Sequence, residues 1–322
     1  MRSLLPEWLR QIAQFISAGV PLAPALRSLS PHLGQPLQKA NQTVSDYLAE
    51  GGTLSEAMQA VEIPLRKSDF VAMDMAHEGG RLDQCLTEIA SWMEKDRAWA
   101  RQTTSVLIYP LVVIHLAALL PFLPLWLNHG FLIAIGFTLI TLTPPYAAAS
   151  LIFILRKKMN SGRSHSLSEK ILHLPWIGQS LHFRATARFC GTFRSGLLSG
   201  ARMDDCLIVA AQASGQSWFE HRISEQAQQM TTGATLSEIV NQAEVFPQVA
   251  ASLLVTGDQS GSLDEMALTA QRQSEELADH YHDLSRKAVL AVSYIWAVFL
   301  VLVAIASIIG PYYYTLYQLL DN

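Results

Sequence analysis

Gly261-Ser262-Leu263-Asp264 has a counterpart earlier in the chain, Gly80-Arg81-Leu82-Asp83. A second pair of matching stretches lies upstream of these, Gly52-Thr53-Leu54-Ser55-Glu56 and Ala234-Thr235-Leu236-Ser237-Glu238. The first pair is offset by 181 residues (261 − 80) and the second by 182 (235 − 53). Because the two offsets agree to within one residue, the sequence predicts a tandem duplication of two homologous modules.

The matching stretches also carry signals for the start of helices. Thr53 and Glu56, like Thr235 and Glu238, have the spacing of a capping box, in which the hydroxyl and the carboxylate bind free backbone amides of the first helical turn. Strand-like alternation of polar and apolar residues is nearly absent. We therefore expect an all-α fold in which each module is a bundle of short helices.

A long apolar segment follows each module. No Lys, Arg, Asp or Glu occurs in residues 106–127, 131–155 or 288–320. Because about 20 apolar residues cross a hydrocarbon layer of about 30 Å, we expect three transmembrane helices, the third ending near Gly310-Pro311. The expected domains are a cytoplasmic module at 1–103, transmembrane helices at 104–128 and 131–155, a basic linker at 156–173, a second cytoplasmic module at 174–285, a transmembrane helix at 286–311 and a short external tail at 312–322.

Cations lie at only one end of each apolar segment. These flanking cations are Arg97, Arg101, Arg156, Lys157, Lys158, Arg163, Arg286 and Lys287. Cytoplasmic flanks of membrane spans carry an excess of Lys and Arg, so we expect both modules and the N-terminus in the cytoplasm and the C-terminus outside it. Because about a hundred residues precede the first span, we do not expect that span to be a cleaved secretion signal.

Composition narrows the class of protein further. The net charge is −4, and no stretch combines clustered cations with aromatic residues, so no nucleic acid is expected as a partner. Cys85, Cys190 and Cys206 all fall in the expected cytoplasmic parts, where thiols stay reduced. We expect all three to pack as small apolar residues.

The second module resembles the secretion-system F domain, the family of inner-membrane platform proteins of type II secretion and type IV pilus machines. The stretches that follow the family's order and spacing are Pro175, Gly178, 198–200, 234–237, Phe246-Pro247 and 257–264. Asp258 stands where the family's Gly-Glu-x-Ser/Thr-Gly-x-Leu pattern has Glu, and in the first module the carboxylate has moved to Glu78. Tyr109-Pro110 also resembles the family. The Glu-Pro pair that the family has near the start of its final span is replaced here, around Val292.

This resemblance implies a location, partners and a role. It implies a multi-pass protein of the bacterial inner membrane that contacts a cytoplasmic assembly ATPase, pilin or pseudopilin subunits, other inner-membrane components of the machine and membrane lipid. It also implies a platform that couples the ATPase to the extraction and polymerisation of those subunits. Because each module is half of a duplication and only three spans are expected, we expect a homo-oligomer of at least two chains.

The glycines of the repeated motifs have a structural interpretation. Gly80 and Gly261 lie where one helix ends and the next begins, a place that often requires positive φ or close backbone approach. The leucine that follows each motif would hold the new helix in the core. The residues to which we assign a structural role are Gly19, Thr53, Leu54, Glu56, Gly80, Leu82, Pro110, Gly200, Thr235, Leu236, Glu238, Gly257, Gly261 and Leu263.

Several titratable residues allow a second interpretation. Glu78, Asp258 and Asp264 could take part in a dimer contact or an oxygen-rich cation site. Residues 279–283 read Asp-His-Tyr-His-Asp, but two histidines that are two positions apart lie on different faces of a helix, so a solvated face is favoured over a metal site. His115 is a polar residue in the first span and is expected to face another helix.

No motif for covalent chemistry is present. The sequence contains no phosphate-binding loop, no Gly-x-Ser-x-Gly elbow and no paired Cys-x-x-Cys motif, and His77 lacks the second histidine of a zinc protease. We therefore expect no enzyme activity, no metal and no cofactor. Two alternatives remain open: a small transporter or channel subunit, which the absence of charged residues in the spans disfavours, and a membrane-tethered enzyme, for which no catalytic constellation is found.

Overall fold

The computed structural model describes residues 4–30, 33–120, 122–160 and 176–320. Every regular element within these residues is a helix, so the expected all-α fold is confirmed. The chain forms two compact units, one from Met1–Ala98 and Ser168–Tyr281 and the other from Trp99–Leu167 and His282–Asn322. We call them the polar unit and the apolar unit.

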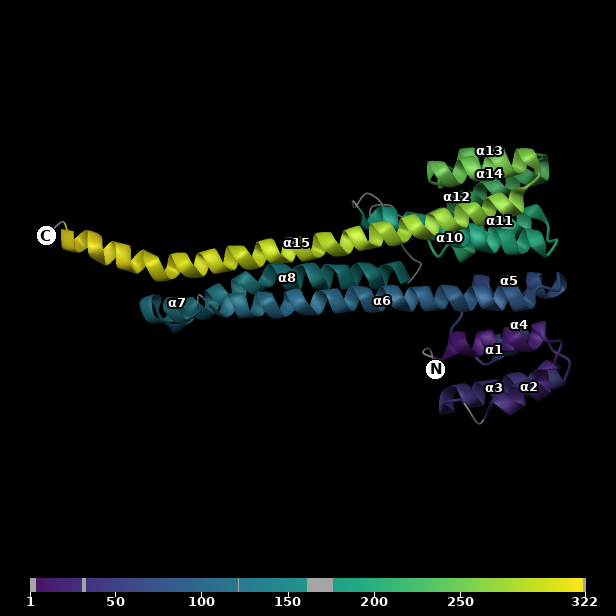
Figure 1. Cartoon of the computed structure of the whole chain (residues 1–322), viewed down its shortest axis with the longest axis horizontal. Coiled ribbons are helices and arrows are strands. Elements are labelled where there is room, and N and C mark those ends of the chain that lie inside the picture. The colour runs from purple at the N-terminus through teal and green to yellow at the C-terminus, as the bar shows by residue number, and fades with distance from the viewer. Residues whose placement is uncertain (1–3, 31–32, 121, 161–175, 321–322) are drawn as a thin grey trace. The chain divides into compact units, whose positions relative to one another are not determined.

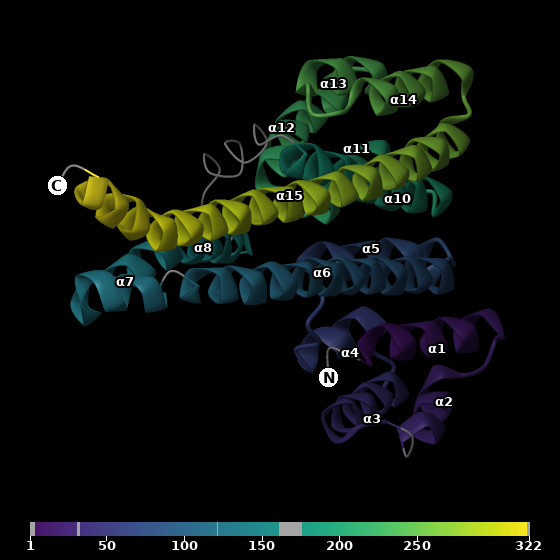
Figure 2. The same ribbon diagram turned by 60° about the vertical axis from the view of Figure 1, so that its left-hand side comes forward.

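The first half of the polar unit, module 1, contains short helices and the beginning of a long one. These are α1 (Leu5–Ser17), α2 (Leu22–Leu29), α3 (Gln35–Ala49), α4 (Leu54–Ala60), α5 (Lys67–Glu78) and α6 (Leu82–Leu119). Figures 1 and 2 show α5 alongside the first part of α6 and α1–α4 together on one side of it. The core of module 1 contains the fully buried Trp8, Leu37 and Met73.

The second half of the polar unit, module 2, has a similar order of helices. These are α10 (Ile177–Leu198), α11 (Met203–Ala213), α12 (Ser217–Ala227), the 3-10 helix η2 (Gln228–Thr232), α13 (Leu236–Ala243), α14 (Gln248–Ser260) and the start of α15 (Leu263–Leu320). Its core stacks Phe189 on Phe193 and packs Phe219 and Phe246 against the Phe189 ring, with centroid distances of 5.0 to 5.5 Å. This core and that of module 1 are separate hydrophobic clusters.

Capping boxes begin the corresponding helices α4 and α13. Thr53 Oγ1 accepts from the Glu56 N–H at 3.2 Å, and a Glu56 carboxylate oxygen accepts from the Thr53 N–H at 3.0 Å. Thr235 and Glu238 make the same two bonds at the same lengths. The first turn of each helix therefore has two of its free amides satisfied by the chain itself.

Glycine ends the helices that precede α6 and α15. Gly80 has φ of +67° and Gly261 has φ of +72°, a region that a residue with a Cβ rarely occupies. The turn between α1 and α2 and the turn between α10 and α11 use Gly19 and Gly200 in the same way, with φ of +68° and +76°.

The apolar unit contains the later parts of α6 and α15 together with α7 (Phe122–His129) and α8 (Phe131–Asn160). Ile114, Ala117, Ala118 and Leu300 form a small buried cluster in it. His115 connects two of its helices, because its Nε2 lies 2.8 Å from the Tyr146 hydroxyl on α8. Within the described residues, the helical stretch Leu263–Ala306 is long and apolar enough to cross a membrane, and Phe131–Thr143 is a shorter apolar helix.

Three helix boundaries differ from those expected. The segment expected as one helix at 104–128 contains the end of α6 at Leu119 and the start of α7 at Phe122. Helix α8 continues to Asn160, five residues into the expected basic linker, whose remaining residues, 161–173, lie outside the described residues. Helix α15 also continues past Gly310-Pro311 to Leu320, because an apolar helix retains its other backbone hydrogen bonds when one proline removes a single donor.

Candidate functional site

One carboxylate joins the two modules of the polar unit. Asp96 lies on α6, and its carboxylate pairs with Arg66 from module 1 at 3.2 Å and with Arg184 and Arg188 from α10 of module 2. Arg188 is nearly fully buried, with 7% of its side chain exposed. A single negative charge therefore holds three guanidinium groups from two segments that are far apart in the sequence.

Further polar contacts surround this ion-pair cluster. Arg66 Nη1 donates to the Ala213 carbonyl at the end of α11, at 3.3 Å. The Arg188 guanidinium lies over the Trp92 ring at 5.4 Å from its centroid. Lys95 Nζ pairs with Glu275 at 2.5 Å, which places α6 beside α15 at this point. Charged groups therefore take part in the junction of the modules, whereas the core of each module is apolar.

Two glycines allow the modules to approach closely. A Cβ placed on Gly79 would lie 2.5 Å from Ser199 Cα and 2.6 Å from the Ser199 carbonyl oxygen. A Cβ on Gly191 of α10 would lie 2.2 Å from a Glu88 carboxylate oxygen. At Gly79 only glycine leaves room for the Ser199 backbone, whereas at Gly191 the flexible Glu88 side chain could shift.

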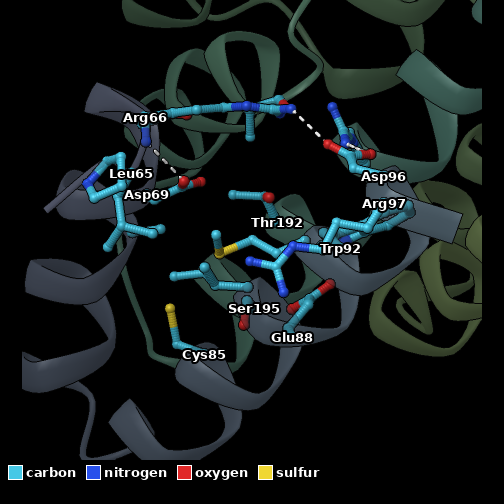
Figure 3. Close-up of a pocket in the computed structure, with 17 residues that line it drawn as sticks. Leu65, Arg66, Asp69, Cys85, Glu88, Trp92, Asp96, Arg97, Thr192 and Ser195 are labelled. Atoms are coloured by element: carbon cyan, nitrogen blue, oxygen red, sulfur yellow. Dashed lines mark hydrogen bonds and ion pairs between the residues drawn. The ribbon is translucent and has the colours of Figure 1, made fainter. Parts of the chain in front are cut away.

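A cavity of about 240 Å³ lies at the junction. Figure 3 shows the Arg66 guanidinium reaching toward Asp96 and the Arg66 backbone directed toward Asp69. The residues that line the cavity come from both modules and include apolar, hydroxyl and charged side chains. They are Pro64, Leu65, Arg66, Ser68, Asp69, Ala72, Cys85, Glu88, Ile89, Trp92, Met93, Asp96, Arg97, Arg188, Thr192, Ser195 and Ala213.

Burial shifts the pKa of several side chains around this cavity. It raises the pKa of Glu88 and of Asp69, and hydrogen bonds from Trp92 and Ser195 to Glu88 and from the Arg66 backbone to Asp69 oppose that rise only in part. Burial and the neighbouring charge of Arg66 lower the pKa of Arg188 to about 9. Burial thus shifts both carboxyls toward their neutral forms and makes Arg188 a weaker base than an exposed arginine.

The thiols of the polar unit are not placed for reaction. Burial raises the pKa of Cys85 at the cavity and raises that of Cys190 to about 12. Since the thiolate is the nucleophile, neither sulfur reacts at neutral pH. Among the described residues, no three His, Cys, Asp or Glu side chains are grouped so as to hold a metal ion.

The candidate cation ligands Glu78, Asp258 and Asp264 do not line this cavity. Asp258 accepts two hydrogen bonds from Ser237, one from its backbone N–H at 2.9 Å and one from its hydroxyl at 2.6 Å. This carboxylate thereby ties α14 to the first turn of α13. The Glu78 side chain is exposed and that of Asp264 is partly buried.

The structural residues of the second motif lie together. A Cβ on Gly257 would lie 2.8 Å from Met266 Cβ and 3.0 Å from Leu263 Cα, so Gly257 lets α14 pack closely on α15. Leu263 is buried, as are Leu54, Leu82 and Leu236 in their own modules. Pro110 lies within α6, and its side chain is outside the described residues.

The histidines at residues 279–283 point to different partners. His282 stacks on Trp99 with centroids 4.5 Å apart, whereas His280 is exposed and meets the edge of the Tyr281 ring. Tyr281 itself stacks on Phe183 of α10 at 5.6 Å. The rings of His280, Tyr281 and His282 thus all take part in aromatic contacts.

Sequence analysis did not identify the cluster around Asp96. Arg184 and Arg188 are four residues apart and so lie on one face of a helix. This spacing is the local signal of the cluster in the sequence. Their partner is 88 or 92 residues away in the chain (184 − 96 and 188 − 96), and no pattern in the sequence connects them.

Comparisons with known proteins agree on one family. The sequence model of type II secretion system protein F matches two stretches of the chain, residues 8–127 and 189–311. Type IV pilus assembly protein PilC of Pseudomonas aeruginosa is 25% identical over 297 residues, covering 85% of this chain and 79% of that protein. Type IV pilus assembly protein TapC of Aeromonas hydrophila is 22% identical over 321 residues, covering 88% and 75%.

A secretion protein is similar to the same extent. Type II secretion system protein F of Pseudomonas aeruginosa is 24% identical over 297 residues, covering 84% of this chain and 72% of that protein. The two stretches matched by the family model together make up more than half of the 322 residues. The chain therefore belongs to the type II secretion system protein F family.

Proposed function

We propose that this chain is an inner-membrane platform protein that couples a cytoplasmic assembly ATPase to the extraction and polymerisation of pilin or pseudopilin subunits. The observation that carries this proposal is the double match to the family model at residues 8–127 and 189–311. Each match contains helices of the polar unit and extends into the apolar unit. The names of the similar proteins, which belong to type IV pilus and type II secretion machines, support the role.

The proposed architecture has two homologous cytoplasmic modules and three transmembrane helices. The helix starts at Leu22 and Met203, and at Leu82 and Leu263, are each 181 residues apart, which supports the duplication. Large apolar side chains on the surface of the apolar unit, such as Leu132 at 84% exposed and Ile295 at 70% exposed, support contact with lipid.

Extraction of a membrane helix needs an external energy source. A helix of about 20 apolar residues gains roughly 6 to 12 kcal/mol on insertion, and no phosphate-binding loop occurs in this chain. A partner ATPase therefore has to supply the work. Helix α15 passes from module 2 into the apolar unit as one continuous helix, so motion received by the module is transmitted without an intervening loop.

Site-specific photo-crosslinking in native membranes tests the role. A photoreactive residue at Val71, which is 40% exposed on module 1, is expected to capture a cytoplasmic ATPase or another machine component. The matched control is Tyr313, which is 71% exposed, lies beyond the expected transmembrane helix at 286–311 and is expected to capture no cytoplasmic protein. If the whole polar unit, scanned in this way, captured neither an ATPase nor a pilin-like subunit, the proposed role would be wrong.

Reporter fusions test the proposed topology separately. A fusion within the expected linker, at residue 165, is expected to report a cytoplasmic position, and a fusion after Asn322 is expected to report a position outside the cytoplasm. An external position for the linker fusion would exclude a direct contact between a cytoplasmic ATPase and module 2.

We also propose that the chain assembles into a homo-oligomer of at least two copies. Closed symmetric association is the usual outcome for soluble proteins that form oligomers from one kind of chain, and we expect the same here. Native mass spectrometry of the purified chain in detergent is expected to show a dimer or a higher oligomer, and a monomer at all concentrations would contradict this part of the proposal.

A further inference from the structure

We propose that the cavity at the junction of the two modules binds a small oxyanion of the phosphate class. The site consists of guanidinium groups from both modules, buried polar atoms that have no hydrogen-bond partner among the described residues, and enough space for a polyatomic ion. Neither the family match nor the role as a platform assigns a ligand to this place.

Several guanidinium groups at the junction share the one charge of Asp96, and the carboxyls of Asp69 and Glu88 also line the cavity. The carboxylate of Asp96 faces Arg66, Arg184 and Arg188, and the Arg97 side chain also lines the cavity. Oxyanions are well suited to such a cluster, because several oxygens can each accept a charge-assisted hydrogen bond from a different guanidinium group.

Two polar atoms at the cavity are left without hydrogen bonds. Ser68 is 4% exposed, and its hydroxyl has no partner among the described residues. Arg188 is 6% exposed, and its Nε likewise has none there, although its Nη2 is paired with Asp96. A buried polar group without a partner is destabilising, so an acceptor supplied from outside the chain would stabilise both atoms.

The carboxyls that share the cavity do not replace such an acceptor. Asp69 already accepts from the Arg66 backbone N–H at 2.9 Å, and burial raises the pKa of both Asp69 and Glu88, which favours their neutral forms. Burial and the like charges of Arg188 and Arg66 lower the pKa of Arg184 despite the opposing effect of Asp279. Burial is the largest cause of this shift, and the close approach of the guanidinium groups adds to it.

The space is larger than one water molecule requires. A cavity needs about 10 to 15 Å³ to hold a water, and this one measures about 240 Å³. Water alone could therefore fill it, but an oxyanion would also place charge-assisted acceptors beside the Arg188 Nε donor and the Ser68 hydroxyl. The experiment below separates these two fillings.

The test is thermal unfolding of the purified full chain in detergent, with inorganic phosphate titrated at constant ionic strength against chloride. Binding is expected to raise the Tm in a saturable manner, by roughly 3 to 5 °C for each tenfold rise in phosphate above its dissociation constant. A Tm that rises no more in phosphate than in chloride would overturn the proposal in favour of water alone.

A pair of serine variants identifies the site. Ser68→Ala removes the unpartnered hydroxyl and no hydrogen bond within the chain, so it is expected to leave the Tm in chloride unchanged while reducing the apparent phosphate affinity about tenfold. The matched control is Ser55→Ala, because Ser55 is also buried but already donates to the Phe70 carbonyl. This control is expected to keep the full response.

The pair also excludes a general salt effect. Phosphate stabilises many proteins through its exclusion from their surface, and that effect would be linear in concentration and equal in all three proteins. An equal response in the wild type and in Ser68→Ala would therefore overturn the assignment to this cavity.

Discussion

Individual glycines have two different functions in the polar unit. Gly80 and Gly261 adopt positive φ at the ends of helices and have no neighbouring atom within 4 Å of an added Cβ. Gly257 and Gly79 instead adopt ordinary backbone angles and leave room for another segment. A side chain at the first kind of position would strain the backbone, whereas a side chain at the second kind would clash with a neighbouring segment.

Gly257→Ala is expected to destabilise module 2. The added Cβ would lie 2.8 Å from Met266 Cβ and 3.0 Å from Leu263 Cα, and overpacking of this kind costs about 1 to 3 kcal/mol. Urea unfolding followed by tryptophan fluorescence measures the loss. Gly136→Ala is the control, because a Cβ there meets nothing within 4 Å in a helix and is expected to leave module 2 unchanged. Equal stability of wild type and Gly257→Ala would show that α14 and α15 do not pack as described.

Glu88 is expected to make the stability of the polar unit depend on pH. Burial raises its pKa from the ordinary value of 4.5, so the folded chain holds a proton that the unfolded chain releases. The sign follows: the contribution is fully present below pH 4.5 and is lost as pH rises through the raised pKa of the folded chain. Glu88→Gln, which is neutral at every pH, is therefore expected to raise the Tm at neutral pH. It is also expected to reduce the fall of the Tm as the pH rises.

Thermal unfolding between pH 4.5 and 8 in wild type and Glu88→Gln measures this effect. The control is Glu94→Gln, since Glu94 is 43% exposed in a surface pair with Arg10 and such pairs contribute about 0 to 1 kcal/mol. If the Tm of Glu88→Gln declined with pH in the same way as that of the wild type, a raised pKa of Glu88 in the folded chain would be contradicted.

At the level of elements, the helix starts depend on side chains close by in the sequence. Capping residues act on the first turn of their own helix, so their effect does not need the rest of the fold. This is why α4 and α13 begin where the repeated Thr-x-x-Glu stretches indicate. The starts of the long helices also depend on nearby residues, since α6 and α15 each begin two residues after a glycine with positive φ.

Thr53→Ala and Thr235→Ala are each expected to lower the free energy of unfolding of their own module by about 1 kcal/mol, because each removes one hydroxyl acceptor from a first turn. Chemical denaturation of the single and double variants is the measurement, and the two losses are expected to add because the sites share no partner. Thr43→Ala is the control: its hydroxyl donates to the Lys39 carbonyl within α3, and its loss is expected to cost nothing. A cost in Thr43→Ala equal to that in Thr53→Ala would contradict the capping role.

At the level of the whole molecule, the polar unit has two apolar cores and one charged junction. Met75 of α5 packs against the core of module 2, and ion pairs and hydrogen bonds of Asp96, Arg66 and Lys95 also join the modules. Polar interfaces of this kind allow relative motion more readily than apolar ones. The junction is therefore the place where the modules separate at the lowest cost.

Asp96→Asn is expected to weaken the docking of the modules and leave each module folded. The substitution leaves three guanidinium groups without their shared charge, which costs about 2 to 4 kcal/mol for a partly buried cluster. Hydrogen exchange is expected to accelerate in α5, α10 and α11 and to stay unchanged in α4 and α13. The control is Asp46→Asn, whose pair with Arg27 is 59% exposed on both sides. Uniformly faster exchange across both modules would show that Asp96 supports folding instead of docking.

Local features of this protein were predictable from the sequence because they depend on residues that are close together in the chain. Helical content, the two capping boxes and the glycines before α6 and α15 all follow from interactions across a few residues, and apolar composition alone indicates a chain that meets lipid. The continuation of α15 to Leu320 was not predicted, because the backbone bonds that remain outweigh the one lost at Pro311.

The junction of the modules was decided by the tertiary structure. Asp96 meets Arg184 and Arg188 across about ninety residues, and the room that Gly79 leaves exists only because Ser199 lies against it. Neither contact has a local signature, since an ion pair or a close approach between distant segments depends on where whole helices pack. The amino-acid order thus determines each module and its apolar continuation, while the packing of one module on the other creates the charged cavity between them.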